Sequence, residues 1–151
     1  MLAEAGNKQP MDRAIYHVSI GVCDMPKARE FYEAALAPLG CRLLYEFKDK
    51  NGADSSLGWG RSFPEFWINL PLDGQEATVS NGAHIAFFAP DKSSVDRFYS
   101  AALSAGGRDD GSPGYRPDYH PGYYGAFVRD PDGNKLEAVW LDFEKNGASL
   151  A

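Results

Sequence analysis

The sequence predicts an α+β fold built from two tandem βαβββ modules, whose sheets curl around a shared cleft. Two observations carry this prediction. An apolar strand, an amphipathic helix and further short strands occur in the same order twice along the chain, and the two copies share identical residues at a constant offset. The chain has 151 residues, of which 44% are hydrophobic and 13% aromatic, so it is long and apolar enough to form one core.

The internal repeat is direct evidence for duplication. At an offset of 67 residues, eight of the 24 positions from His17 to Gly40 are identical to their counterparts, with no gap. A fixed period of this kind indicates a repeated supersecondary unit. The identical pairs are His17 and His84, Asp24 and Asp91, Phe31-Tyr32 and Phe98-Tyr99, Ala34-Ala35-Leu36 and Ala101-Ala102-Leu103, and Gly40 and Gly107.

The first module begins with a β-rich run at residues 15–20. Asp24 is a good N-cap, Pro26 is tolerated in a first helical turn, and apolar residues from Ala28 to Leu39 recur at helical spacing until Gly40 ends the helix. We then expect strands at about 42–47, 56–60 and 65–70.

The second module repeats this order. A strand at 84–88 is followed by the N-cap Asp91, a helical stripe from Val95 to Leu103 and a stop at Gly106-Gly107. A degenerate strand near Arg108 and a loop rich in Gly, Pro and Tyr at 111–122 lead to strands at 123–129 and 135–141. The turn Asp130-Pro131-Asp132-Gly133-Asn134 joins the last two strands.

These elements define the domain organisation. Residues 12–141 form one domain, made of modules at about 12–72 and 82–141. The polar, patternless residues 1–11 are expected to be a disordered or non-native tail, and 142–151 a C-terminal tail.

Composition excludes several classes of function. The chain has 15 Lys and Arg against 21 Asp and Glu, for a net charge of −6, whereas proteins that bind nucleic acid or anionic membranes carry a basic surplus. No apolar run reaches the roughly 18 residues of a membrane span, and no signal peptide opens the chain. Cys23 and Cys41 cannot form a disulfide framework. We therefore expect a cytoplasmic protein with free thiols.

Four polar side chains are predicted to share the cleft. Successive residues of a strand point to opposite faces, so an apolar face packs on the helices and the other face is free for function. In the four strands that open and close the two modules, that free face carries His17, Asn69, His84 and Glu137.

The sequence resembles the vicinal oxygen chelate superfamily, which includes glyoxalase I, bleomycin-resistance proteins and extradiol dioxygenases. The resemblance covers about residues 12–141. His17 and His84 opening the two units, the helix from Asp24 to Phe31-Tyr32, and the ending from Tyr123 through Asp130-Pro131-Asp132-Gly133-Asn134 to Glu137 carry it.

The resemblance implies a metal centre and a small-molecule substrate. Carried over residue by residue, the ligands are His17, His84 and Glu137, around one divalent ion: Fe, Mn, Ni, Zn or Co. Asn69 stands where glyoxalase-like members have a Glu, so the set looks more like that of extradiol dioxygenases and fosfomycin-resistance transferases. Neutral imidazoles with one carboxylate suit such an ion and leave positions open for substrate oxygens.

Other residues have two interpretations each. His120 and Tyr124, in and after the aromatic loop, are candidates for catalysis with Glu137, but a His in such a loop is as often a surface residue. Trp67 shares the face of Asn69 and is a candidate, with it, for substrate binding, or else for core packing. Arg129 could meet an anionic substrate or simply hold the hairpin.

Two functions follow from these residues. The first is a metal-dependent enzyme of dioxygenase, lyase, isomerase or transferase type that chelates a small substrate through vicinal oxygens. The second is a metal-free protein that sequesters a flat or cationic molecule, as bleomycin-resistance proteins do, with a hydrogen-bonded Glu137–His pair. A homodimer is expected in either case, because family members often pair to complete the cleft.

Overall fold

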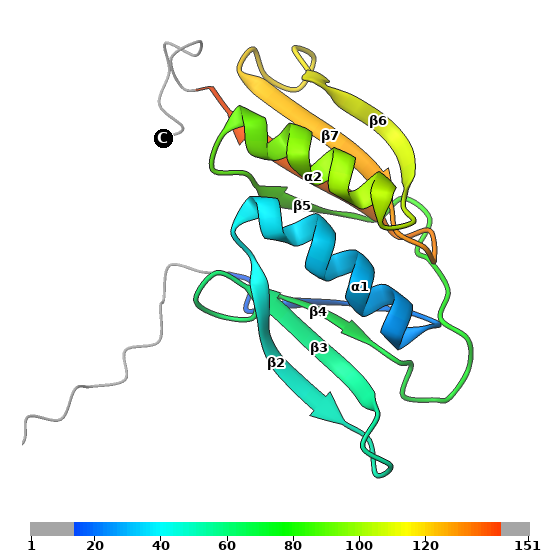
Figure 1. The fold of residues 1–151 in the computed structure, drawn as a ribbon. Coiled ribbons are helices and arrows are strands. Elements are labelled where there is room, and N and C mark those ends of the chain that lie inside the picture. The colour runs from blue at the N-terminus through cyan, green and yellow to red at the C-terminus, as the bar shows by residue number, and fades with distance from the viewer. Residues whose placement is uncertain (1–13, 143–151) are drawn as a thin grey trace, which may run out of the picture.

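The computed structural model describes residues 14–142 and confirms the two βαβββ modules (Figure 1). The predicted tail at 1–11 and all of 142–151 except Asp142 lie outside the described residues. The first module consists of β1 (Val18–Gly21), α1 (Met25–Leu36) with a 3₁₀ turn (Ala37–Leu39), β2 (Arg42–Lys48), β3 (Asp54–Gly60) and β4 (Phe66–Asn69). The second consists of β5 (His84–Phe88), α2 (Lys92–Ser104), β6 (Arg108–Tyr115), β7 (Tyr123–Arg129) and β8 (Lys135–Leu141).

Each module forms a four-stranded mixed sheet with the same topology. The strand orders are β1-β4-β3-β2 and β5-β8-β7-β6. In each sheet the first and last strands of the module pair in parallel, and the other neighbours are antiparallel. Because the topology is identical, strand register provides a residue-by-residue correspondence between the modules.

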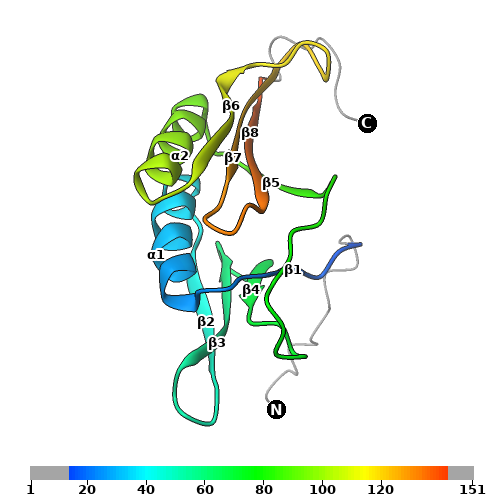
Figure 2. The same ribbon diagram turned by 90° about the vertical axis from the view of Figure 1, so that its right-hand side faces the viewer.

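The two helices begin at the predicted caps. The Asp24 carboxylate accepts a hydrogen bond from the Lys27 amide at 3.0 Å, and the Asp91 carboxylate accepts one from the Ser94 amide at 2.7 Å. These bonds satisfy amides that a helix leaves unpaired in its first turn. Both helices lie on the same side of the molecule and contact each other, and the sheets lie on the other side (Figure 2). Each sheet therefore has one face against a helix and one open face.

One core joins the modules. The buried apolar residues of both helices and both sheets form a single cluster, in which the rings of Phe66 and Phe87 meet edge to face at 5.2 Å. A polar contact also crosses the boundary, because the Tyr32 hydroxyl on α1 donates to Asp130 in the β7–β8 turn at 2.6 Å, and both residues are fully buried. The position of one module is thus fixed by the other.

Strand β1 is shorter than predicted and starts later. It begins at Val18, because its only partner β4 has four residues and the ladder cannot extend further. His17 consequently lies just before the strand. Tyr16, which falls within the predicted strand at 15–20, is 71% exposed, and its ring contacts that of Phe63.

Strand β6 replaces part of the predicted loop. Residues 108–115 form a strand with register shifts around Gly111 and Gly114, so the loop begins only after Tyr115. Pro113 is tolerated there because β6 is the outer strand of its sheet, where a missing amide donor costs no ladder bond. The glycines and proline that favoured a loop instead mark irregularities in an edge strand.

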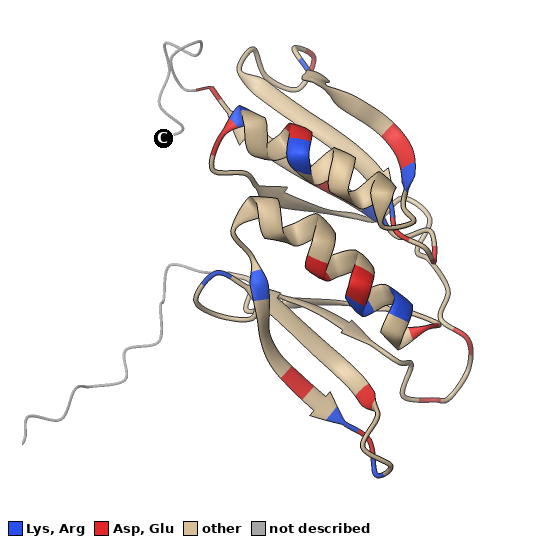
Figure 3. Ribbon diagram, in the orientation of Figure 1, with Lys and Arg blue, Asp and Glu red and all other residues tan. Residues whose placement is uncertain are grey.

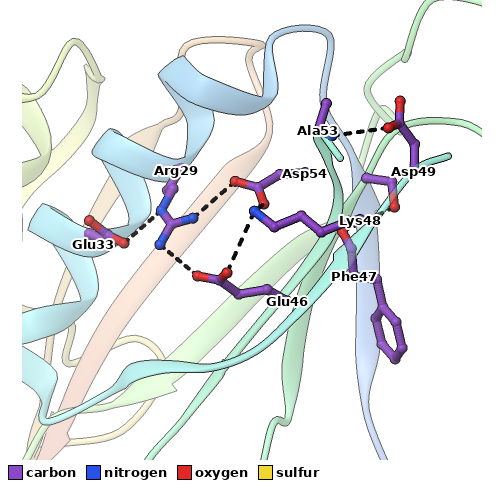
Figure 4. Close-up of polar contacts among 9 residues, drawn as sticks. Arg29, Glu33, Glu46, Phe47, Lys48, Asp49, Ala53 and Asp54 are labelled. Atoms are coloured by element: carbon purple, nitrogen blue, oxygen red, sulfur yellow. Dashed lines mark hydrogen bonds and ion pairs between the residues drawn. The ribbon is translucent and has the colours of Figure 1, made fainter. Parts of the chain in front are cut away.

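Charges are distributed unevenly over the elements. Strands β4 and β5 carry no Lys, Arg, Asp or Glu, whereas α1 and the β2–β3 hairpin carry many (Figure 3). Arg29 on α1 pairs with Glu46 on β2 and Asp54 on β3, so a charge network ties the hairpin to the helix (Figure 4).

Within residues 14–142, no helix has the length and apolar character needed to cross a membrane.

Candidate functional site

Glu137 is the centre of the candidate site. It lies on the open face of β8, yet it is only 2% exposed. One carboxylate oxygen, Oε2, is 3.2 Å from Nε2 of His84, and the other, Oε1, accepts a hydrogen bond from the Tyr123 hydroxyl. A buried carboxylate is costly unless it is paired, so His84 and Tyr123 are the groups that make this position possible.

Strand register brings these side chains together. Glu137 lies opposite Ala86 on the parallel strand β5 and opposite Phe127 on the antiparallel strand β7. His84 is two residues before Ala86 and therefore on the same face. A Cβ on Gly125 would lie 3.2 Å from the Glu137 Oε1 atom and 3.2 Å from the Tyr123 ring, so glycine leaves room for their contact.

Tyr123, rather than Tyr124, reaches Glu137. Tyr124 points to the helix side of β7, where its hydroxyl donates to Asp96 on α2 at 2.7 Å. Burial and the Asp96 carboxylate raise the pKa of Tyr124 to about 12. Burial and the Glu137 carboxylate raise the pKa of Tyr123 above its ordinary value as well. Sequence reasoning missed Tyr123, although extending the period of two from Glu137 across β7 would have placed it on the open face.

The open face of the first module carries an aromatic group instead. The Trp67 indole lies over Gly58, where a Cβ would come within 2.8 Å of the ring. Phe47 stacks on the indole at 5.7 Å, and the His17 ring lies 6.3 Å from it. The indole N–H donates to the Pro64 carbonyl at 3.2 Å and fixes the ring in place. The Tyr45 ring also lies 6.3 Å from the indole, and we call Tyr45, Phe47 and Trp67 the aromatic platform.

Register equates Trp67, rather than Asn69, with Glu137. Trp67 lies opposite Ser19 on β1, as Glu137 lies opposite Ala86 on β5, and Ser19 and Ala86 are separated by the repeat offset of 67. Asn69 lies two residues further along and accepts a hydrogen bond from the Ser56 hydroxyl. Neither position carries a carboxylate, so the first module offers His17 without the acid that His84 has.

Within residues 14–142, no three His, Cys, Asp or Glu side chains come together to hold a metal ion. His84 and Glu137 have the spacing of two ligands, but His17 does not join them in one group. His84 lines a cleft of about 210 Å³ with Ser19 and Lys135, whereas His17 lines a separate cleft of about 300 Å³ with Phe88. A single chain therefore supplies two of the three expected ligands at one point.

The remaining predicted residues have local partners. Nδ1 of His120 accepts a hydrogen bond from the Gly122 amide at 3.4 Å within the loop. Arg129 donates to Asp110 at 3.0 Å and to the Gly133 carbonyl at 3.1 Å, which holds the hairpin. Asn69 lines an open groove of about 690 Å³ that shares Ser19 and Gly21 with the cleft of His84.

Comparison with known proteins gives one consistent result. Residues 14–138 match the model of the Glyoxalase/Bleomycin resistance protein/Dioxygenase superfamily. A glyoxalase/bleomycin resistance protein from Albidiferax ferrireducens T118 is 33% identical, with a TM-score of 0.71 over 84% of this chain and 98% of that chain.

More distant structures share the fold. A glyoxalase/bleomycin resistance protein/dioxygenase family enzyme from Burkholderia phytofirmans PsJN is 16% identical, with a TM-score of 0.60 over 82% of this chain and 95% of that chain. A lactoylglutathione lyase from Agrobacterium tumefaciens is 18% identical, with a TM-score of 0.58 over 87% of this chain and 95% of that chain. No curated protein matches the sequence.

Proposed function

The chain belongs to the glyoxalase/bleomycin resistance protein/dioxygenase superfamily, and on that premise we propose that it is a divalent-metal-dependent enzyme acting on a small molecule with two vicinal oxygens. The observation that carries the proposal is Glu137, a carboxylate that is 2% exposed on an open sheet face and is paired there with His84. An imidazole and a carboxylate at this spacing are a pair of ligands for a borderline divalent ion.

The third ligand is His17 of a second copy of the chain. His17 and the aromatic platform occupy the open face of one module, and His84 and Glu137 occupy that of the other. A twofold dimer that sets the first module of one copy against the second module of the other would complete two equivalent sites. Exposed aromatic residues on these sheets support such an interface, since Tyr45, Phe47 and Phe88 are each more than half exposed.

The residues of this chain would bind the ion and orient the substrate. An ion held by two neutral imidazoles and one carboxylate keeps a net positive charge, and it would stabilise an oxyanion or enolate formed on the substrate. Tyr123 holds one oxygen of Glu137 and leaves the other directed at His84. The aromatic platform would form the opposite wall of the completed site.

Metal content and subunit mixing test the proposal. Protein purified without chelator should contain one divalent ion per chain and scatter light as a dimer, and Glu137→Gln and His17→Ala should each lose the ion. Mixing unfolded Glu137→Gln and His17→Ala chains and refolding them should restore about a quarter of the wild-type metal sites, because only mixed dimers contain one intact site. His120→Ala is the control and should keep the ion.

No recovery of metal on mixing would contradict a site shared between chains. A monomer at all working concentrations would contradict the dimer.

We expect little lactoylglutathione formation from methylglyoxal and glutathione. The positions that could supply a second carboxylate ligand hold Trp67 and Asn69, which leaves a site less suited to carboxylate-based proton shuttling and better suited to oxygenase, transferase or isomerase chemistry on an oxygenated compound. The assay is run across several reconstituting metals. Robust turnover that disappears in Glu137→Gln would assign the protein to the glyoxalase branch instead.

A metal-free binding protein is the second candidate. Glu137 already has Tyr123 and His84 as partners without an ion, and the aromatic platform presents rings to a flat ligand. This function predicts no bound metal in wild-type protein and tight binding of a planar compound that Trp67→Leu abolishes. Metal analysis of the wild-type protein separates the two candidates.

A further inference from the structure

Arg116 lies on the open face of the second module, the face that also carries the His84–Glu137 pair. It follows β6, and its guanidinium lies against the side of that strand where Gly111 and Gly114 have no side chain. A Cβ on Gly114 would lie 3.0 Å from one terminal nitrogen of Arg116, and a Cβ on Gly111 would lie 3.5 Å from the other. Nη2 donates to the Ser112 carbonyl at 2.7 Å. The side chain is therefore positioned by the strand that carries it.

Phe127 connects Arg116 to the paired residues. The guanidinium carbon of Arg116 is 5.8 Å from the centre of the Phe127 ring, and the Lys135 ammonium is 4.8 Å from it. The His84 ring is 6.1 Å from the same ring, and Phe127 is the register partner of Glu137. Two cations thus lie one side chain away from the carboxylate that we place at the centre of the site.

The charges on this face are unbalanced. Lys135 and Arg129 both pair with Asp110, at 3.1 Å and 3.0 Å. Arg116 forms no ion pair with any acidic side chain among residues 14–142, and its guanidinium donates to the carbonyls of Ser112 and Tyr115. A guanidinium has five N–H donors, so donors remain for a ligand. This is a partly buried, unpaired cation in a chain whose net charge is −6.

We propose that Arg116 binds an oxyanion of the substrate, a carboxylate or a phosphate, while the rest of the substrate reaches His84 and Glu137. The planar guanidinium suits a bidentate contact with either group. Lys135 adds a second positive charge beside the Phe127 ring. The inference rests on the proposed function in placing the substrate on this face, and it adds that the substrate is an anion.

Three probes that share a phenyl ring, of which benzoate and benzamide also match in shape, test the charge requirement. Benzoate, phenyl phosphate and benzamide are titrated into the full-length protein in a buffer without oxyanions, and binding is followed by ligand-observed NMR. We expect benzoate or phenyl phosphate to bind at least about tenfold more tightly than benzamide, because charged hydrogen bonds are the stronger ones. The better of the two anions identifies the group. Equal affinity for the amide and both anions would overturn the proposal.

Two variants locate the contact. Arg116→Met should lower anion affinity at least about tenfold, whereas Arg42→Met, which removes an exposed cation from the other sheet, should leave it unchanged. Gly114→Ala keeps the charge but places a methyl group 3.0 Å from the guanidinium, and it should lower the affinity for the anion a few-fold. Circular dichroism checks that each variant is folded.

The outcomes separate this inference from the metal proposal. Wild-type anion affinity in Arg116→Met would overturn the inference, even with metal content intact. Dissociation of the dimer in Arg116→Met, without a loss of anion affinity, would show that an acid of a second copy is its partner and would also overturn it. If the protein binds no metal but anion binding still depends on Arg116, the metal proposal fails and the oxyanion site is supported.

Discussion

At the scale of single residues, two buried carboxylates of the described chain serve different ends. Asp130 accepts hydrogen bonds from the Tyr32 hydroxyl, from the amides of Asp132 and Asn134, and from the Asn134 side chain. These donors occupy both of its oxygens, so it has little capacity for a ligand. The turn that carries much of the family resemblance is therefore a structural joint between the modules.

Glu137 differs because each of its carboxylate oxygens has one partner and can accept a further donor or an ion. It has the Tyr123 hydroxyl on one oxygen and His84 on the other. The direct contact between the His84 imidazole and the Glu137 carboxylate, at 3.2 Å, can be replaced by an ion that both groups then bind. The number of donors around each carboxylate thus distinguishes the joint from the candidate site.

Removing the Tyr32 hydroxyl tests the joint. Tyr32→Phe should lower the free energy of unfolding by about 1–3 kcal/mol, because a fully buried carboxylate loses a donor at 2.6 Å. Tyr99→Phe is the matched control, since Tyr99 is the repeat-equivalent residue, is less buried than Tyr32 and has no fully buried carboxylate as its partner, so the loss of its hydroxyl should cost less. Urea unfolding measures both. Equal losses would contradict a special role for the Tyr32–Asp130 bond.

At the scale of elements, a charge network fixes the β2–β3 hairpin to α1. Arg29 contacts Asp54 at 2.9 Å and Glu46 at 2.7 Å, and Lys48 bridges the same two acids (Figure 4). Phe47 lies between Glu46 and Lys48 and points to the opposite face, where it stacks on Trp67. The network therefore holds the strand that carries part of the aromatic platform.

Acid should weaken this network through Asp54. Hydrogen bonds from Lys48 and Arg29 lower the pKa of Asp54 below its ordinary value of 3.8. The unfolded chain then binds the proton more readily, so the contribution to stability is complete above about pH 4–5 and is lost as pH falls through the lowered pKa. Asp54→Asn should flatten the fall of unfolding free energy below pH 4.

The control for this measurement is Asp118→Asn, which changes an exposed loop carboxylate that has no ion pair within residues 14–142. It should keep the wild-type slope. An Asp54→Asn profile that is parallel to wild type at acidic pH would refute the network's contribution.

At the scale of the whole molecule, the two modules share a core and should unfold together. Phe66 and Phe87 pack across the boundary, and Asn134 of the second module donates to the Gly21 carbonyl of the first at 3.2 Å. Neither module can lose its packing without exposing apolar surface of the other. Duplication has therefore produced one cooperative unit.

Coincident unfolding curves would check this. In a Trp140→Phe variant the remaining tryptophans, Trp59 and Trp67, lie in the first module, so fluorescence reports that module and far-ultraviolet circular dichroism reports both. We expect the same urea midpoint from both signals. Two separate transitions would mean that the modules unfold independently.

The sequence by itself determined the two βαβββ modules, the helix caps and the shared face of His84 and Glu137, because these depend on the local periods of 3.6 and 2 and on capping chemistry. Only the tertiary structure decided which of those side chains meet. The β5–β8 register joins His84 to Glu137, whereas His17 belongs to the other sheet and does not join them in one group within the described residues. Tyr123 and Arg116 were likewise found only in the structure, because the contact of Tyr123 with Glu137 and that of Arg116 with the Phe127 ring join different strands and leave no period in the sequence.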